Sequence, residues 1–124
     1  MTEDIGQRWL EAFTEGVSEE LLNKYVIEYG NYLWHIFSWE LVPCVSGDAA
    51  RSAFDLLEYD RAIRFEGGGR SGKRLLMLTN ISETGKLSAL DLESVNDVYI
   101  TAEDFSWTYV HTHESCCGPY FLKK

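Results

Sequence analysis

The 124-residue sequence contains no apolar run that approaches the roughly 18 residues needed to cross a bilayer. Its start, Met1 to Asp4, is acidic where a signal peptide is basic, and no long apolar stretch follows. Cysteine is scarce: Cys44, Cys116 and Cys117 are an odd number, and the last two are adjacent, which suits a disulfide scaffold poorly. These absences predict a protein of the reducing cytosol that does not bind membranes.

Basic residues are also few, with 11 Lys and Arg against 20 Asp and Glu and a net charge of -9. Residues 1–60 hold twelve acids and three bases, whereas residues 61–124 hold eight of each. A negative field repels phosphate backbones, so nucleic acid is not an expected partner. The same field attracts a basic protein. The acidity is equally typical of a surface charge that only maintains solubility.

Apolar residues make up 45% of the chain and aromatic residues 14%, which is enough to bury a core without disulfides. We therefore expect a single domain over residues 1–124. Periodicity and turn residues predict the elements in chain order: helices over 3–17 and 18–29, a strand over 32–40, a helix over 49–57 capped by Asp48, a hairpin with strands over 61–66 and 73–79, and strands over 98–101 and 106–111. This order, ααβαββββ, predicts an α+β fold, an antiparallel sheet of about four to five strands with an N-terminal helical hairpin and one further helix packed on one face.

A glycine-rich segment raises the question of nucleotide binding. Gly67, Gly72 and Lys73 have the spacing of a phosphate-binding loop, but Arg74 stands where a magnesium-binding Ser or Thr is needed. The residues that follow read at least as well as a strand as a helix. The segment is better explained as a hairpin tip, and no cofactor is predicted.

The C-terminal region holds the densest group of metal-capable side chains: His111, His113, Glu114, Cys116 and Cys117. On a strand the two histidines project to the same face, as a metal site needs, and a cysteine or Glu114 could complete it. The group lacks the usual zinc spacings, so histidines that bond to neighbouring backbone are the preferred interpretation.

The candidate partner-binding residues come from charge and aromatic content. The acidic candidates lie on the predicted helical pair, and the aromatic ones are core residues first and interface anchors where exposed. They are Glu11, Glu15, Glu19, Glu20, Glu28, Trp34, Trp39, Trp107 and Tyr109.

Several motifs resemble a small bacterial family, the domain-of-unknown-function family numbered 4275. They are the segments 34–40 and 47–54, the segment 104–114 with its Trp-Thr-Tyr-Val and Thr-His-Glu, and the ending Gly-Pro-Tyr-Phe over 118–121. The resemblance runs from about the first helix to the C-terminus and brings no catalytic residues. It implies that the C-terminal motif acts as a unit.

The sequence leaves three functional hypotheses. The preferred one is a non-enzymatic, acidic protein-binding module, an immunity protein that neutralises a basic, nuclease-type bacterial toxin. The second is a metal-binding protein or metal-assisted enzyme that uses the C-terminal cluster. The third is a structural protein that associates with itself through an exposed aromatic strand, so a monomer or a weak homodimer is expected.

Overall fold

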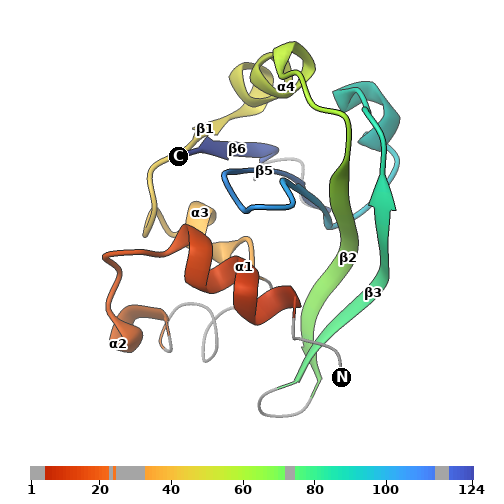
Figure 1. The fold of residues 1–124 in the computed structure, drawn as a ribbon. Helices are drawn as coiled ribbons and strands as arrows, with labels where there is room; N and C mark the ends of the chain where they lie inside the picture. Colours follow the sequence, from red (N-terminus) through yellow and green to blue (C-terminus); the bar gives the residue numbers. More distant parts are fainter. Residues whose placement is uncertain (1–4, 23, 25–32, 72–74, 114–117) are drawn as a thin grey trace.

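A six-stranded antiparallel sheet organises the computed structural model, which describes residues 5–22, 24, 33–71, 75–113 and 118–124. The strands, in the spatial order β1-β6-β5-β4-β2-β3 (Figure 1), are β1 (Val45–Ser46), β2 (Ala62–Ser71), β3 (Leu75–Thr84), β4 (Val98–Thr101), β5 (Trp107–His111) and β6 (Tyr120–Lys123). The helices are α1 (Ile5–Phe13), α2 (Glu19–Leu22), α3 (His35–Ser38), α4 (Gly47–Leu56) and the 3-10 helix η2 (Ala89–Leu92). The α+β class and the antiparallel sheet are thus as predicted.

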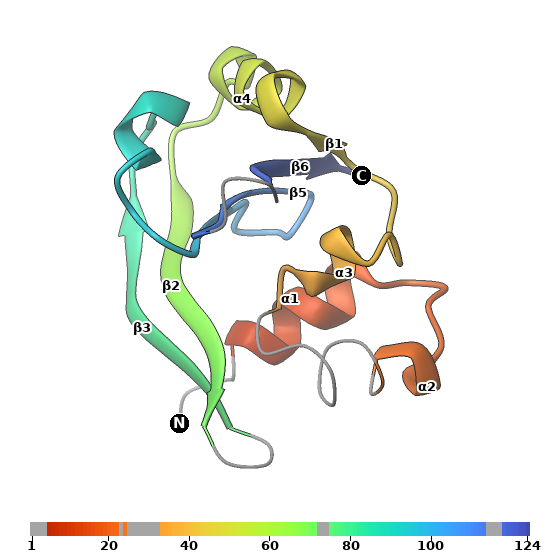
Figure 2. The same ribbon diagram turned by 180° about the vertical axis from the view of Figure 1, so that it is seen from behind.

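Helices cover both faces of the sheet, not one face as the sequence suggested. Alternate residues of a strand point to opposite faces. Tyr99 packs in a core cluster with α1 and α3, whereas its neighbours Val98 and Ile100 pack in a second cluster with α4 and η2. Figures 1 and 2 show α1 and α3 on one side of β5 and β6, and α4 on the other. The strands β4 and β5 are therefore buried on both faces.

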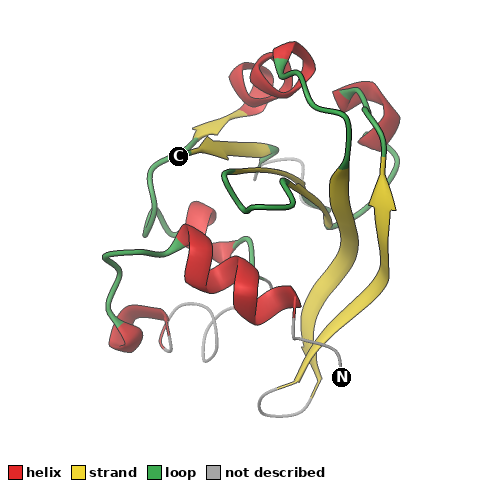
Figure 3. Ribbon diagram, in the orientation of Figure 1, coloured by secondary structure: helices red, strands yellow, loops and turns green. Residues whose placement is uncertain are grey.

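The predicted strand over 32–40 is wrong for the part that the structure describes. Residues 33 and 34 form a turn, and residues 35–38 form α3, drawn as a helix in Figure 3. Leu33 and Trp34 are buried, and so are Ile36 and Phe37. Burial therefore recurs after three residues, from Leu33 to Ile36 and from Trp34 to Phe37, which is a helical spacing. The aromatic content of the segment favoured a strand and concealed this spacing.

Two strands that were not predicted from the sequence, β1 and β6, extend the sheet beyond β5. Val45 pairs with Phe121 in β6, and β6 pairs in turn with β5. Gly118 has a φ of 85°, and a side chain on it would lie 3.2 Å from the Thr112 hydroxyl. Glycine therefore suits the turn that returns the chain beside β5, which gives the Gly-Pro ending a structural role.

The other predicted elements match in type, and most of them differ in length, whereas the 3-10 helix η2 was not predicted. The α1 helix ends before Gly16, which has a φ of 88°. The Ser18 hydroxyl accepts a hydrogen bond from the Leu21 N–H at 3.2 Å, as expected of an N-cap. The rest of the predicted second helix lies outside the described residues, apart from Lys24. The hairpin strands β2 and β3 are longer than predicted, and α4 begins at Gly47, so Asp48 is in its first turn and is not its cap. No helix among the described residues is long and apolar enough to cross a membrane.

Two fully buried tyrosines, Tyr99 and Tyr109, allow a matched test of the core. The Tyr109 hydroxyl has no hydrogen-bond partner among the described residues, and burial raises its pKa far above the usual range. The Tyr99 hydroxyl accepts a bond from the Trp34 N–H at 3.2 Å. Tyr109→Phe should leave the free energy of unfolding unchanged or raise it by up to about 1 kcal/mol, whereas Tyr99→Phe should lower it by about 1 kcal/mol. Urea unfolding measures both; a clear loss in Tyr109→Phe would reveal a missing partner.

Candidate docking face and pocket

Residues 11–20, which run from the last turn of α1 to the start of α2 and are called the α1–α2 connection below, carry a group of exposed acidic side chains. The apolar side of α1 is buried, and the Trp9 indole N–H donates to the Thr108 hydroxyl at 2.9 Å. This anchoring turns the opposite side of α1 outward. Glu11, Glu15, Glu19 and Glu20 are all exposed, and Glu15, Glu19 and Glu20 form no ion pair among the described residues. Glu28 lies outside the described residues.

The four aromatic candidates separate by burial. Trp34 and Tyr109 are fully buried and Trp107 is 6% exposed, so these three side chains belong to the core and are not available to a partner. Trp39, at the end of α3, is 48% exposed. Of the four, Trp39 alone fits the role of an interface anchor.

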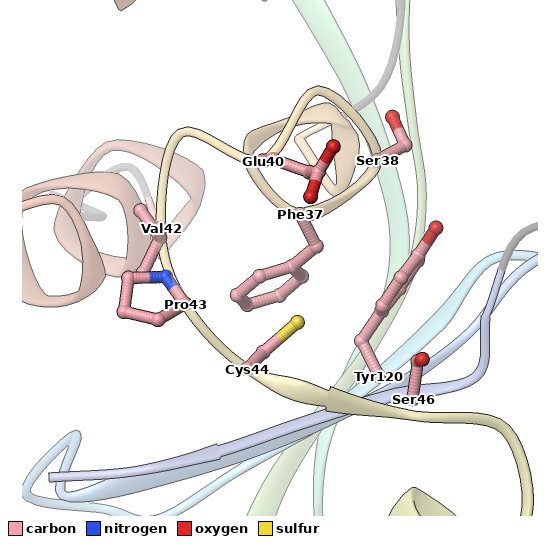
Figure 4. A pocket seen from close by; sticks show the side chains of 8 residues that line it. All are labelled: Phe37, Ser38, Glu40, Val42, Pro43, Cys44, Ser46 and Tyr120. Atoms are coloured by element: carbon pink, nitrogen blue, oxygen red, sulfur yellow. The ribbon is translucent and has the colours of Figure 1, made fainter.

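A pocket of about 490 Å³ lies beside the end of α3, between the α3–β1 connection and β6. Figure 4 shows the Phe37 ring and the Cys44 thiol pointing toward each other, with the Tyr120 ring to one side. The α3–β1 connection runs along the same side of the molecule as the α1–α2 connection (Figures 1 and 2). The other lining residues are Ser38, Glu40, Val42, Pro43 and Ser46. Nothing in the sequence marked this pocket, because Tyr120 joins it from the far end of the chain.

The pocket combines apolar walls with one carboxylate. Phe37, Val42 and Tyr120 are buried side chains, and Glu40 is exposed at the α3 end. Partial burial raises the pKa of the Cys44 thiol to about 11, so the thiol is neutral at physiological pH. A neutral thiol behaves as a small apolar group and not as a nucleophile.

A buried carboxylate, Asp97, fixes the start of α3. Its Oδ1 accepts hydrogen bonds from the Trp34 indole N–H at 2.9 Å and from the His113 backbone N–H at 3.2 Å. The His113 imidazole Nδ1 lies 2.9 Å from both carboxylate oxygens. Within α3, the imidazole of the first residue, His35, and the hydroxyl of the last, Ser38, are hydrogen bonded at 2.9 Å. Asp97 therefore holds in place the helix that presents Phe37 and Trp39.

The two C-terminal histidines have different partners. The His111 Nδ1 bonds to the Val95 carbonyl at 2.8 Å, and its Nε2 lies 3.9 Å from Glu93, whereas His113 bonds to Asp97. The described part of the chain has no group of three or more His, Cys, Asp or Glu side chains arranged to hold a metal. Glu114, Cys116 and Cys117 lie outside the described residues.

An exposed apolar patch lies where α4 meets η2. Leu56 is 81% exposed and Leu90 is 80% exposed. The residues that precede them in the chain are hydrogen bonded, because the Asp55 carboxylate accepts from the Ala89 N–H at 2.7 Å. The acids here are largely engaged: Asp48 and Glu93 both pair with Arg51. The patch thus combines two exposed leucines with acids that include the ion-paired Asp48 and Glu93.

Comparison with known proteins identifies a family. The family model described as Domain of unknown function (DUF4275) matches residues 3–121. No curated protein and no solved structure matches the chain.

Proposed function

Because the chain belongs to the DUF4275 family, whose description gives no activity, we propose a function from the surface: the protein is an acidic protein-binding module that docks a basic protein on the α1–α2 connection. In its specific form the partner is a nuclease-type bacterial toxin, and the chain is the immunity protein that neutralises it by direct binding. The observation that carries the proposal is the exposed group Glu11, Glu15, Glu19 and Glu20.

Three acids of this surface, Glu15, Glu19 and Glu20, form no ion pair among the described residues. Arg61 pairs with Glu83 and Arg64 with Glu66, so these bases of the hairpin neutralise its own acids and not the helices. The negative field of the α1–α2 connection is therefore not cancelled by them. Such a field accelerates encounter with a basic partner, and it disfavours phosphate backbones.

Exposed apolar side chains supply the other requirement of a stable interface. Trp39 and Leu21 are both large and exposed, and the pocket beside Trp39 offers a recess. Exposed tryptophans beside such recesses are frequent hot spots, because they bury a large area at small entropic cost. Charge then governs the rate of encounter, and these groups govern the lifetime of the complex.

Affinity capture from the native organism tests the proposal. The wild-type chain should retain a basic protein at low salt, and the variant with Glu15, Glu19 and Glu20 changed to Lys should not. The variant with Leu56 and Leu90 changed to Ser is the matched control and should behave as wild type. If the leucine variant does not retain the basic protein and the charge variant does, the docking surface is the α4–η2 patch, and the proposal is wrong.

Gene order gives an independent check of the specific form. Immunity proteins must be made together with their toxins, so a gene for a toxin or its secretion apparatus should lie beside this one. If the gene has no such neighbour, the proposal of a toxin partner is wrong, and only the general proposal of a protein-binding module remains.

A further inference from the structure

We propose that the pocket between α3, β1 and β6 is a binding site for an organic cation, an ammonium or guanidinium group on an apolar stem. This chemistry is shared by free amines and by the Lys or Arg side chains of a protein. The inference rests on the pocket itself and does not require the docking function proposed above.

The walls suit an apolar stem. The Phe37 and Tyr120 rings lie 5.4 Å apart between centroids and are tilted by 35°, and both side chains are buried by the surrounding core. Aromatic faces attract cations as well as apolar groups. The neutral Cys44 thiol, which points at Phe37 in Figure 4, adds a further uncharged surface. The volume of about 490 Å³ lies within the usual range for small-ligand sites, roughly 300–1,000 Å³.

Glu40 determines the charge of the ligand. It is the one charged residue among the described residues that line the pocket. Its backbone has a φ of 58°, and its N–H donates to the Phe37 carbonyl at 3.0 Å, so the turn that ends α3 sets its position. Ser38 and Ser46 also line the pocket, with uncharged polar side chains. With one carboxylate and no lining base, the pocket repels an anion and favours a cation.

Titration of the isotope-labelled, full-length protein with small probes tests the site by NMR. The probes are 2-phenylethylamine, N-acetyl-arginine methylamide and the neutral 2-phenylethanol. The cations should shift the signals of Phe37, Cys44 and Tyr120 at millimolar concentration and should slow alkylation of Cys44, followed by peptide mass spectrometry. The neutral alcohol should bind about tenfold more weakly, as expected for the loss of one charge-assisted hydrogen bond.

Two variants define the role of the carboxylate. Glu40→Gln should weaken the binding of both cations about tenfold and leave the affinity for the alcohol unchanged. Glu58→Gln, an exposed acid after α4, is the matched control and should change nothing. Binding of the amine alone would assign the site to free amines, and binding of both cations would extend it to protein side chains. Equal affinity for alcohol and amine, or no shifts with any probe, would overturn the inference. Since no protein partner is used, failure here is separate from failure of the docking function.

Discussion

Replacing Asp97 by alanine should lower the free energy of unfolding by about 3 kcal/mol or more. The change leaves the Trp34 indole N–H, the His113 backbone N–H and the His113 imidazole without their carboxylate partner. A buried donor that loses its partner costs about 1–3 kcal/mol, with larger values for charged acceptors. Asp97 also has a φ of 45°, which alanine tolerates less well than aspartate or asparagine.

Two comparisons make this prediction specific. Asp97→Asn keeps a hydrogen-bond acceptor and tolerates the backbone conformation. Its free energy of unfolding should therefore fall clearly less than that of the alanine variant. Asp104→Ala removes an exposed carboxylate that accepts from the Ser106 N–H at 3.1 Å, and it should cost about 1 kcal/mol or less. Urea unfolding followed by tryptophan fluorescence measures all three. An alanine variant at 97 as stable as the one at 104 would mean that the start of α3 is held by other contacts.

Changing Glu15, Glu19 and Glu20 to Lys should slow association with the captured basic protein by roughly tenfold or more at low salt. Each reversal alters the charge by two, so the net charge moves from -9 to -3. The side chains are exposed, and exposed substitutions usually cost under roughly 0.5 kcal/mol each, so the domain should stay folded. The dissociation rate should change less, because charges outside the buried contact act mainly on encounter.

The matched control places the same charge change on another surface. Asp48, Glu58 and Asp60 are exposed acids on and after α4, and their change to Lys gives the same net charge. Stopped-flow mixing should show a much smaller loss of association rate for this variant. Equal losses in both variants would show that only the total charge matters and that the α1–α2 connection is no special surface.

The density of β-branched and aromatic residues explains both the correct and the wrong parts of the fold prediction. The strands β4 and β5 were predicted with nearly correct bounds, because they are dense in β-branched and aromatic residues. All four residues of β4 are buried, however. A strand that is buried on both faces does not alternate between apolar and polar residues, so the sequence did not show that helices cover both faces of the sheet. In α3 the same aromatic richness suggested a strand. Only the contacts of Trp34 with Asp97 and Tyr99, both more than 60 residues away, show why the chain turns there.

The candidate site was predictable in its charges and not in its shape. Exposed acids follow from the periodicity of α1, since the apolar stripe fixes which side faces solvent. Which of the tryptophans is exposed depends on tertiary packing, and Trp39 differs from Trp34 in nothing that the local sequence shows. Asp97 gave no signal, because a single acid before a strand is common. The pocket needs Tyr120 beside Phe37, a contact between distant segments.

The dependence of the association rate on salt, measured for the wild-type chain and its basic partner, tests the docking proposal most directly. Attraction between exposed charges is screened beyond about 8 Å at physiological ionic strength. If the acidic α1–α2 connection steers the partner, the association rate should fall markedly as salt rises, while the dissociation rate changes little. An association rate that is indifferent to salt would contradict the proposal, and the acidity would then serve only to keep the protein soluble.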